Sequence, residues 1–116
     1  MKEEQKAADY LCDILEVGEK ISKFTHGLTY EKFCDDEKTV WAVVRGLEIV
    51  GEAARNISPG FRDKYSRIPW RLMIGMRDRL IHDYGGVNLV IVWNAASKEL
   101  PDLEPQIRQI LDELGD

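Results

Sequence analysis

The chain has 116 residues, of which 44% are hydrophobic and 32% are charged, and its net charge is -5. This length and composition predict one globular domain over residues 1–116, and the negative charge argues against indiscriminate binding to nucleic acids. No apolar run approaches the length of a membrane span and the first residues lack the apolar core of a signal peptide, which excludes a membrane protein and leaves a cytoplasmic protein as the expectation.

The first half of the chain has apolar residues at helical spacing. One stripe predicts a helix over about residues 3–24, which Thr25-His26-Gly27 ends, and a short helical turn is expected at 29–33. A second stripe predicts a long helix over about residues 36–57, which Ser58-Pro59-Gly60 closes. These patterns predict two long helices joined by a short connection.

Two glycines lie inside the second long helix, at Gly46 and Gly51. Glycine inside a helix costs about 1 kcal/mol relative to alanine. Their presence predicts that another helix packs very close to this one. That helix belongs either to the same chain or to a second copy, and the sequence leaves both alternatives open.

The second half of the chain predicts a polar, basic loop followed by three helices. Pro69 is placed to be the first residue of a helix over about residues 69–84, which Gly85-Gly86 stops. Further apolar stripes predict a fourth helix over about residues 89–100 and a fifth that Pro101 or Asp102 opens. No segment shows strand alternation. The predicted fold is therefore all-α, a four- or five-helix up-and-down bundle.

Cysteine and histidine are too few for the common metal sites. Cys12 and Cys34 form no CxxC pair, and we expect two buried, unpaired thiols, with a disulfide as the less favoured alternative. His26 and His82 are the only histidines, which excludes a multi-histidine site within one chain. The carboxylates are plentiful but stand in no recognisable ligand spacing, so we expect no metal and no cofactor, with a carboxylate-based Mg site as the open alternative.

The segment Arg77-Asp78-Arg79-Leu80-Ile81-His82-Asp83-Tyr84 concentrates the chemistry of the chain. Arginine binds phosphate, histidine exchanges protons near neutral pH, and tyrosine offers a hydroxyl that can be modified. Together they predict chemistry on a phosphodiester, with RNA as the leading candidate. Residues 62–79 hold six basic and two acidic residues and lead into this segment, which makes Arg71 and Arg79 candidates for binding the flanking RNA backbone. An ordinary solvated helix face is the competing interpretation.

Helical geometry places Arg77 close to the core face of the predicted third helix, the face of Met73 and Met76. A guanidinium beside a core requires a carboxylate or a wet cleft. Glu48 or Glu52 on the preceding long helix is a candidate to supply the carboxylate. Arg77 is then either a structural ion-pair partner or a catalytic residue.

His82 lies on a different side of the same predicted helix, about 140° from Arg77 on an ideal helix. Asp78 precedes His82 at the i, i+4 spacing and is a candidate to orient the imidazole, as is Asp83. Convergence of Arg77 and His82 requires helix distortion, a long arginine reach, or the copy of a second protomer across a symmetric interface. We favour a homodimer whose two motifs line one cleft.

The whole pattern resembles the HEPN superfamily, and specifically its HepT-like toxin branch. The superfamily signature is arginine, four to six residues, histidine, any residue and tyrosine, which Arg77, His82 and Tyr84 match without departure. Residues 45–53 and the segments around 68–77 and 90–103 also look like this branch, so the resemblance covers nearly the whole chain.

The resemblance implies a dimerising helical bundle with metal-independent endoribonuclease activity, in which Arg77 and His82 are the active residues. It also implies an MntA-like nucleotidyltransferase antitoxin as partner, which inactivates the toxin by attaching AMP to Tyr84. Two alternatives remain from the residues alone. One is a non-catalytic module that binds nucleotides or pairs with a nucleotidyltransferase, and the other is a structural dimerisation bundle.

Overall fold

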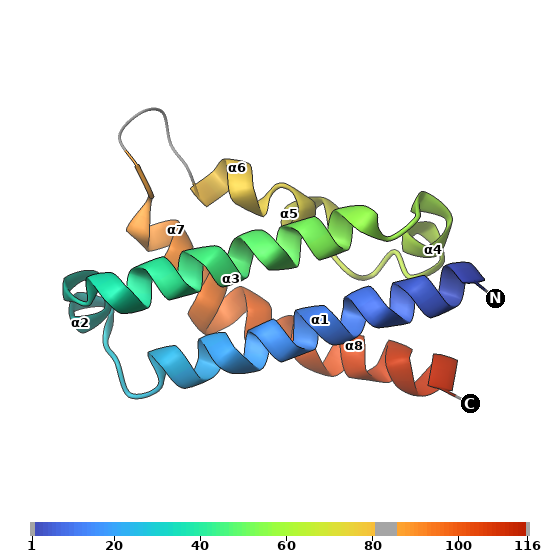
Figure 1. Cartoon of the computed structure of the whole chain (residues 1–116), viewed down its shortest axis with the longest axis horizontal. Coiled ribbons are helices and arrows are strands. Elements are labelled where there is room, and N and C mark those ends of the chain that lie inside the picture. The colour runs from blue at the N-terminus through green and yellow to red at the C-terminus, as the bar shows by residue number, and fades with distance from the viewer. Residues whose placement is uncertain (1, 81–85, 116) are drawn as a thin grey trace.

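The computed structural model describes residues 2–80 and 86–115, with the exception of the side chains of Arg77 and Leu80. The chain runs up and down in four passes, and the two ends of the described chain lie at the same end of the molecule (Figure 1). The passes are α1 (Lys2–Thr25); α3 (Glu37–Asn56); α5 (Trp70–Ile74) with α6 (Met76–Leu80); and α7 (Leu89–Asn94), the π-helical turn η1 (Ala95–Glu99) and α8 (Leu100–Gly115). Two short helices, α2 (Tyr30–Asp35) and α4 (Pro59–Lys64), lie at the turns.

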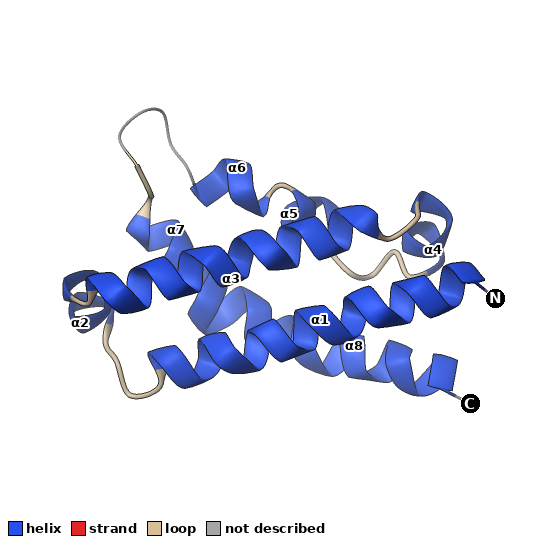
Figure 2. Cartoon of the chain, viewed as in Figure 1, coloured by secondary structure: helices blue, strands red, loops and turns tan. Residues whose placement is uncertain are grey.

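The described residues contain helices and connections and no β-strand (Figure 2). This confirms the predicted all-α class. The core forms where the antiparallel helices α1 and α3 meet, and it is completed by α8 against α1 and by α5 and α6 against α3. Its fully buried side chains come from every pass and include Leu11, Ile14, Ile21, Phe33, Leu47, Met73, Met76, Ile107 and Ile110.

Side-chain caps explain why the short connections are folded. Thr29 accepts a hydrogen bond from the N–H of Lys32 at 3.2 Å and so begins α2. Asp36 accepts one from the N–H of Thr39 at 3.1 Å and begins α3. Each cap satisfies a backbone donor that the first turn of a helix leaves without a partner.

The two glycines of α3 lie where other parts of the same chain approach most closely. A Cβ atom at Gly46 would lie 2.9 Å from Cδ1 of Ile21 on α1. At Gly51 it would lie 2.9 Å from the backbone oxygen of Met73 on α5. The prediction of a tightly packed neighbour is confirmed, and both of these neighbours belong to the same chain.

Three predicted element boundaries were wrong. The segment after Ser58 is not a plain loop, because Ser58 accepts a hydrogen bond from the N–H of Phe61 at 3.2 Å and caps α4. The predicted helix 69–84 is divided at Gly75 into α5 and α6, and Pro69 is the N-cap rather than the first helical residue. The predicted fourth and fifth helices are not separate, because η1 joins α7 directly to α8.

Two further features bear on the chemistry that the chain can carry. Cys12 and Cys34 are unpaired, but Cys12 is exposed, so the expectation that both thiols are buried was wrong. In residues 2–80 and 86–115, no helix combines the length and apolarity needed to cross a bilayer.

Candidate active site

The segment that carries the predicted motif begins on α6, of which the structure describes Met76–Leu80. Met76 anchors this helix, since its side chain is 2% exposed and lies at the contact with Gly51 of α3. The backbone of Arg77 follows directly within α6. The side chain of Arg77 and residues 81–85, which include His82 and Tyr84, lie outside the described residues. The predicted convergence of Arg77 and His82 therefore stays a prediction.

Arg79 on α6 is engaged by a carboxylate that the sequence did not indicate. Its Nη2 donates to Oε1 and Oε2 of Glu99 on η1, at 3.3 and 3.2 Å. Each of these side chains is 30% exposed, and the other terminal nitrogen, Nη1, is buried without a hydrogen-bond partner among the described residues. Arg79, a candidate for binding RNA, thus lies in an ion pair that joins α6 to η1.

Much of the basic segment before the motif has a structural role. Lys64 pairs with Glu4 at 3.2 Å, and this hydrogen bond raises the pKa of the lysine above its ordinary value. The Nε of Arg62 donates to the backbone oxygen of Ile57 at 3.0 Å. Arg71, by contrast, is exposed on α5 and has no ion pair within the described part of the chain. Arg67 is likewise exposed without an ion pair in that part of the chain, so both guanidinium groups are open to an anionic ligand.

The acidic candidates lie on two separate surfaces. Asp78 is exposed on α6. Glu48 and Glu52 line a groove between α3 and α1 with a volume of about 510 Å³, together with Tyr10, Asp13, Arg45, Ile49, Ala53 and Asn56. Glu48 lies 3.7 Å from Arg45 in that groove. Because the side chain of Arg77 and residue His82 lie outside the described residues, the expected pairing of these carboxylates with them stays a prediction.

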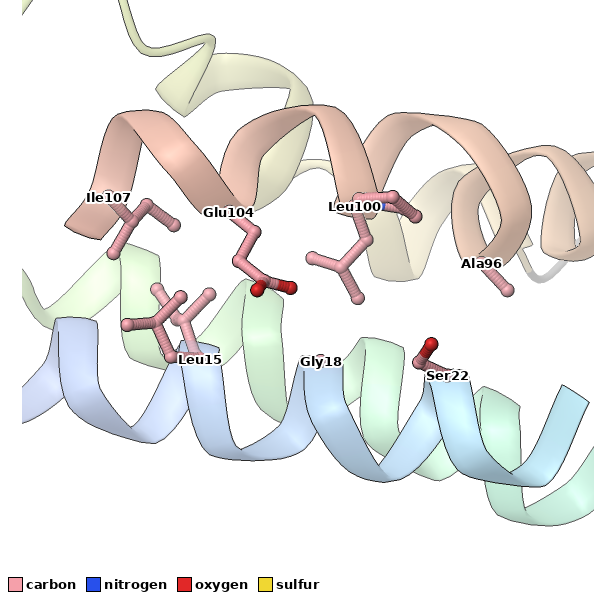
Figure 3. Close-up of a pocket in the computed structure, with 9 residues that line it drawn as sticks. Leu15, Gly18, Ser22, Ala96, Leu100, Glu104 and Ile107 are labelled. Carbon is pink, nitrogen blue, oxygen red and sulfur yellow. The ribbon is translucent and has the colours of Figure 1, made fainter. Parts of the chain in front are cut away.

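The bundle also has a small pocket on its other side. Figure 3 shows it between α1, η1 and α8, where Leu15 and Gly18 face Leu100 and Glu104. Its volume of about 40 Å³ is far below the roughly 300–1,000 Å³ of typical ligand sites. The pocket is therefore too small to hold a nucleotide. Within residues 2–80 and 86–115, no group of three or more His, Cys, Asp or Glu side chains is arranged to hold a metal ion.

The fold and the motif together define a class of protein: a small helical bundle in which the arginine–histidine–tyrosine motif begins on α6. The chain belongs to the HepT-like ribonuclease family, because the family model described as "Ribonuclease HepT-like" matches residues 14–110. This confirms the family that the sequence resembled.

Relatives agree with this assignment. The chain is 45% identical over 102 residues to a protein of Caldanaerobacter subterraneus subsp. tengcongensis named "Putative RNase", covering 88% of this chain and 91% of that one. It is 43% identical over 102 residues to the "Probable ribonuclease HepT" of Thermococcus cleftensis, covering 88% of this chain and 93% of the relative. A "Putative RNase" of Methanocaldococcus jannaschii is 40% identical over 105 residues, covering 90% and 87% of the two chains. No solved structure matches the chain.

Proposed function

We propose that the chain is a metal-independent endoribonuclease, the toxin of a toxin–antitoxin pair, and that it cleaves RNA with Arg77 and His82. One observation carries the proposal: the complete signature of Arg77, His82 and Tyr84 occurs in a chain of the HepT-like ribonuclease family. Arg71, exposed on the helix before the motif, is proposed to bind the flanking RNA backbone.

The active form is proposed to be a homodimer. On an ideal helix about 140° separates Arg77 from His82, so one subunit alone does not bring them together without distortion. A two-fold axis beside the motif places two copies of each residue in one cleft. Asp78 is proposed to orient the imidazole of His82, and Glu48 or Glu52 to orient the guanidinium of Arg77.

RNA supplies its own nucleophile, the 2'-hydroxyl, so the protein needs to move two protons and stabilise one charged phosphorus centre. In the proposed reaction, His82 of one subunit takes the 2'-hydroxyl proton while the 2'-oxygen attacks phosphorus. The bond to the 5'-oxygen breaks, and His82 of the partner subunit gives that oxygen a proton. Arg77 donates to the non-bridging oxygens and offsets their growing charge. The products are a 2',3'-cyclic phosphate and a 5'-hydroxyl.

The proposed inhibitor is an MntA-like nucleotidyltransferase that attaches AMP to Tyr84. The tyrosine lies two residues after His82, so the modification would place a phosphate and a base beside the catalytic pair. It would occupy the anion site and repel RNA. The assay is mass spectrometry after incubation with such a partner and ATP, and AMP found on a residue other than Tyr84 would contradict the assignment.

The central experiment is an RNA cleavage assay with purified protein in EDTA, comparing the unmodified chain with His82→Ala. Loss of a general acid–base group is expected to lower the cleavage rate at least about 100-fold without lowering the melting temperature. His26→Ala is the matched control, because His26 is the other histidine and is exposed beyond α1. Full activity in His82→Ala, or loss of activity in EDTA, would refute the proposal.

A further inference from the structure

We infer that the ion pair between Arg79 and Glu99 is a positioning device, which fixes α6 so that the motif is presented correctly for cleavage. The inference rests on the proposed function. It assigns to Arg79 a role through α6 rather than through direct contact with RNA, and it adds Glu99, which no sequence signal indicated, to the functional residues.

The first argument concerns the contacts that hold α6 on both sides of Arg77. Helices in proteins are stabilised mainly by tertiary packing, so contacts with the rest of the chain position α6. Besides its packing against α7, α6 makes two contacts through named side chains: Met76 packs against α3, and Arg79 bonds to Glu99. These residues lie on either side of Arg77 in the sequence. Fixing both therefore fixes the rotation of α6, and with it the backbone that carries Arg77.

The second argument is the way in which Glu99 is presented. Glu99 ends η1, where the N–H of Leu100 donates to the oxygen of Ala95 in a π-helical bond. Pro101 follows and has no N–H to continue the α-helical pattern, which explains the wider turn. The extra residue in this turn sets the direction of Glu99 differently from a regular helix. The π-helical turn thus supplies the carboxylate that α6 requires.

The third argument is that the pair is poorly built for stability alone. A single nitrogen of Arg79 contacts both oxygens of Glu99, so the two-nitrogen fork of an optimal arginine–carboxylate pair is not formed. Nη1 is buried without a partner among the described residues. Such pairs are often replaced by apolar side chains with little loss of stability. The position of this ion pair between α6 and η1 is better explained by a role in orienting α6 than by a contribution to stability.

The test is the double variant Arg79→Met/Glu99→Met, compared with the unmodified chain in the same cleavage assay. We expect the melting temperature to change little, kcat to fall about 10- to 100-fold and KM to stay within about twofold, because misplacement by about 1 Å is enough for such losses. The exchanged pair Arg79→Glu/Glu99→Arg should recover much of kcat. If Arg79 instead binds RNA directly, KM rises, the exchanged pair recovers nothing, and the inference is overturned.

Two further measurements separate this inference from the proposed function. The control variant Arg108→Met/Glu19→Met removes another long-range pair, at 3.1 Å between α8 and α1, and should keep full activity. Hydrogen exchange of the α6 amides should be faster in Arg79→Met/Glu99→Met than in this control. Unchanged exchange overturns the inference whatever the activity, whereas faster exchange in a chain that never cleaves RNA overturns the proposed function and leaves the anchoring of α6 supported.

Discussion

The contact of Gly51 with α5 allows a quantitative test of how the motif segment is held. Gly51→Ala would place a Cβ atom 2.9 Å from the backbone oxygen of Met73 and 3.8 Å from Cβ of Met76. Carbon and oxygen do not approach to 2.9 Å without repulsion, and a backbone oxygen cannot rotate away as a side chain can. The α5–α6 segment must therefore move away from α3.

Two effects of opposite sign determine how much Gly51→Ala changes the free energy of unfolding. Alanine is favoured over glycine in a helix interior by about 1 kcal/mol, and overpacking a filled site costs about 1–3 kcal/mol. Since the obstacle at Gly51 is backbone, we expect the cost to lie in the upper part of that range and the net loss to be about 1–2 kcal/mol. For a chain of 116 residues this lowers the melting temperature by about 4–8 °C.

Two other helix glycines serve as matched controls because they share the same gain in helix propensity. At Gly18 a Cβ atom would lie 3.7 Å from Leu100, an ordinary contact that partly fills the small pocket of Figure 3, so Gly18→Ala should stabilise the protein by up to about 1 kcal/mol. At Gly46 the obstacles are side chains, Cδ1 and Cγ1 of Ile21 at 2.9 and 3.0 Å and Cγ1 of Val17 at 3.1 Å, which can shift more than backbone, so the stability of Gly46→Ala should fall between those of the other two variants.

Thermal unfolding of the three alanine variants, followed by circular dichroism, measures this order. RNA cleavage well below the melting temperature adds a second measure, because a shifted α6 should lower the activity of Gly51→Ala more than that of Gly46→Ala. A Gly51→Ala protein that melts at or above the temperature of Gly18→Ala would refute the reasoning, since the packing cost would then be absent.

Two more predictions concern charge. Hydrogen bonds from the hydroxyl and the N–H of Thr39 hold the pKa of Asp36 below its ordinary value of 3.8. The stability that this cap contributes is therefore fully present above pH 3.8. It is lost as the pH falls through the lower pKa that Asp36 has in the folded protein. Asp36→Asn, which keeps a capping oxygen, should flatten this part of an acid-unfolding curve followed by circular dichroism, and an unchanged curve would contradict the cap as its cause. Arg71→Gln should reduce the slope of log(kcat/KM) against log[salt] by about 0.7, whereas Arg108→Gln should not, and equal slopes would remove Arg71 from the RNA-binding surface.

The long helices were predictable because their apolar stripes repeat over many turns. Residues such as Leu11 and Ile14 on α1, and Leu47 and Val50 on α3, are buried where the helical pattern places them. The two glycines of α3 correctly predicted close packing, because glycine in a helix interior lowers helix stability and close packing accounts for its presence there. The predicted all-α class followed from these patterns alone.

The short helical turn expected at 29–33 corresponds to α2, but α4 and the division between α5 and α6 were missed because their signals have two meanings. Ser58-Pro59-Gly60 was interpreted as the end of the long helix, yet a serine followed by proline is equally the start signal of a new one, and α4 begins there. At Gly75 the converse happened. The apolar spacing of Met73 and Met76 continues through the glycine, so the sequence predicted one helix, whereas the structure divides it beside its closest approach to Gly51.

The role of Glu99 was not predictable for a related reason. Pro101 was interpreted as a boundary between two helices, since proline removes a hydrogen bond of the helix interior. The chain instead absorbs the missing donor by widening one turn, so that α7, η1 and α8 continue as one run. That change of register alters the face on which each later residue lies, and no periodicity calculated for a regular helix contains it. The pairing of Arg79 with Glu99 therefore depends on a backbone adjustment at Pro101, and this dependence explains why the motif could be identified in the sequence while its support on η1 could not.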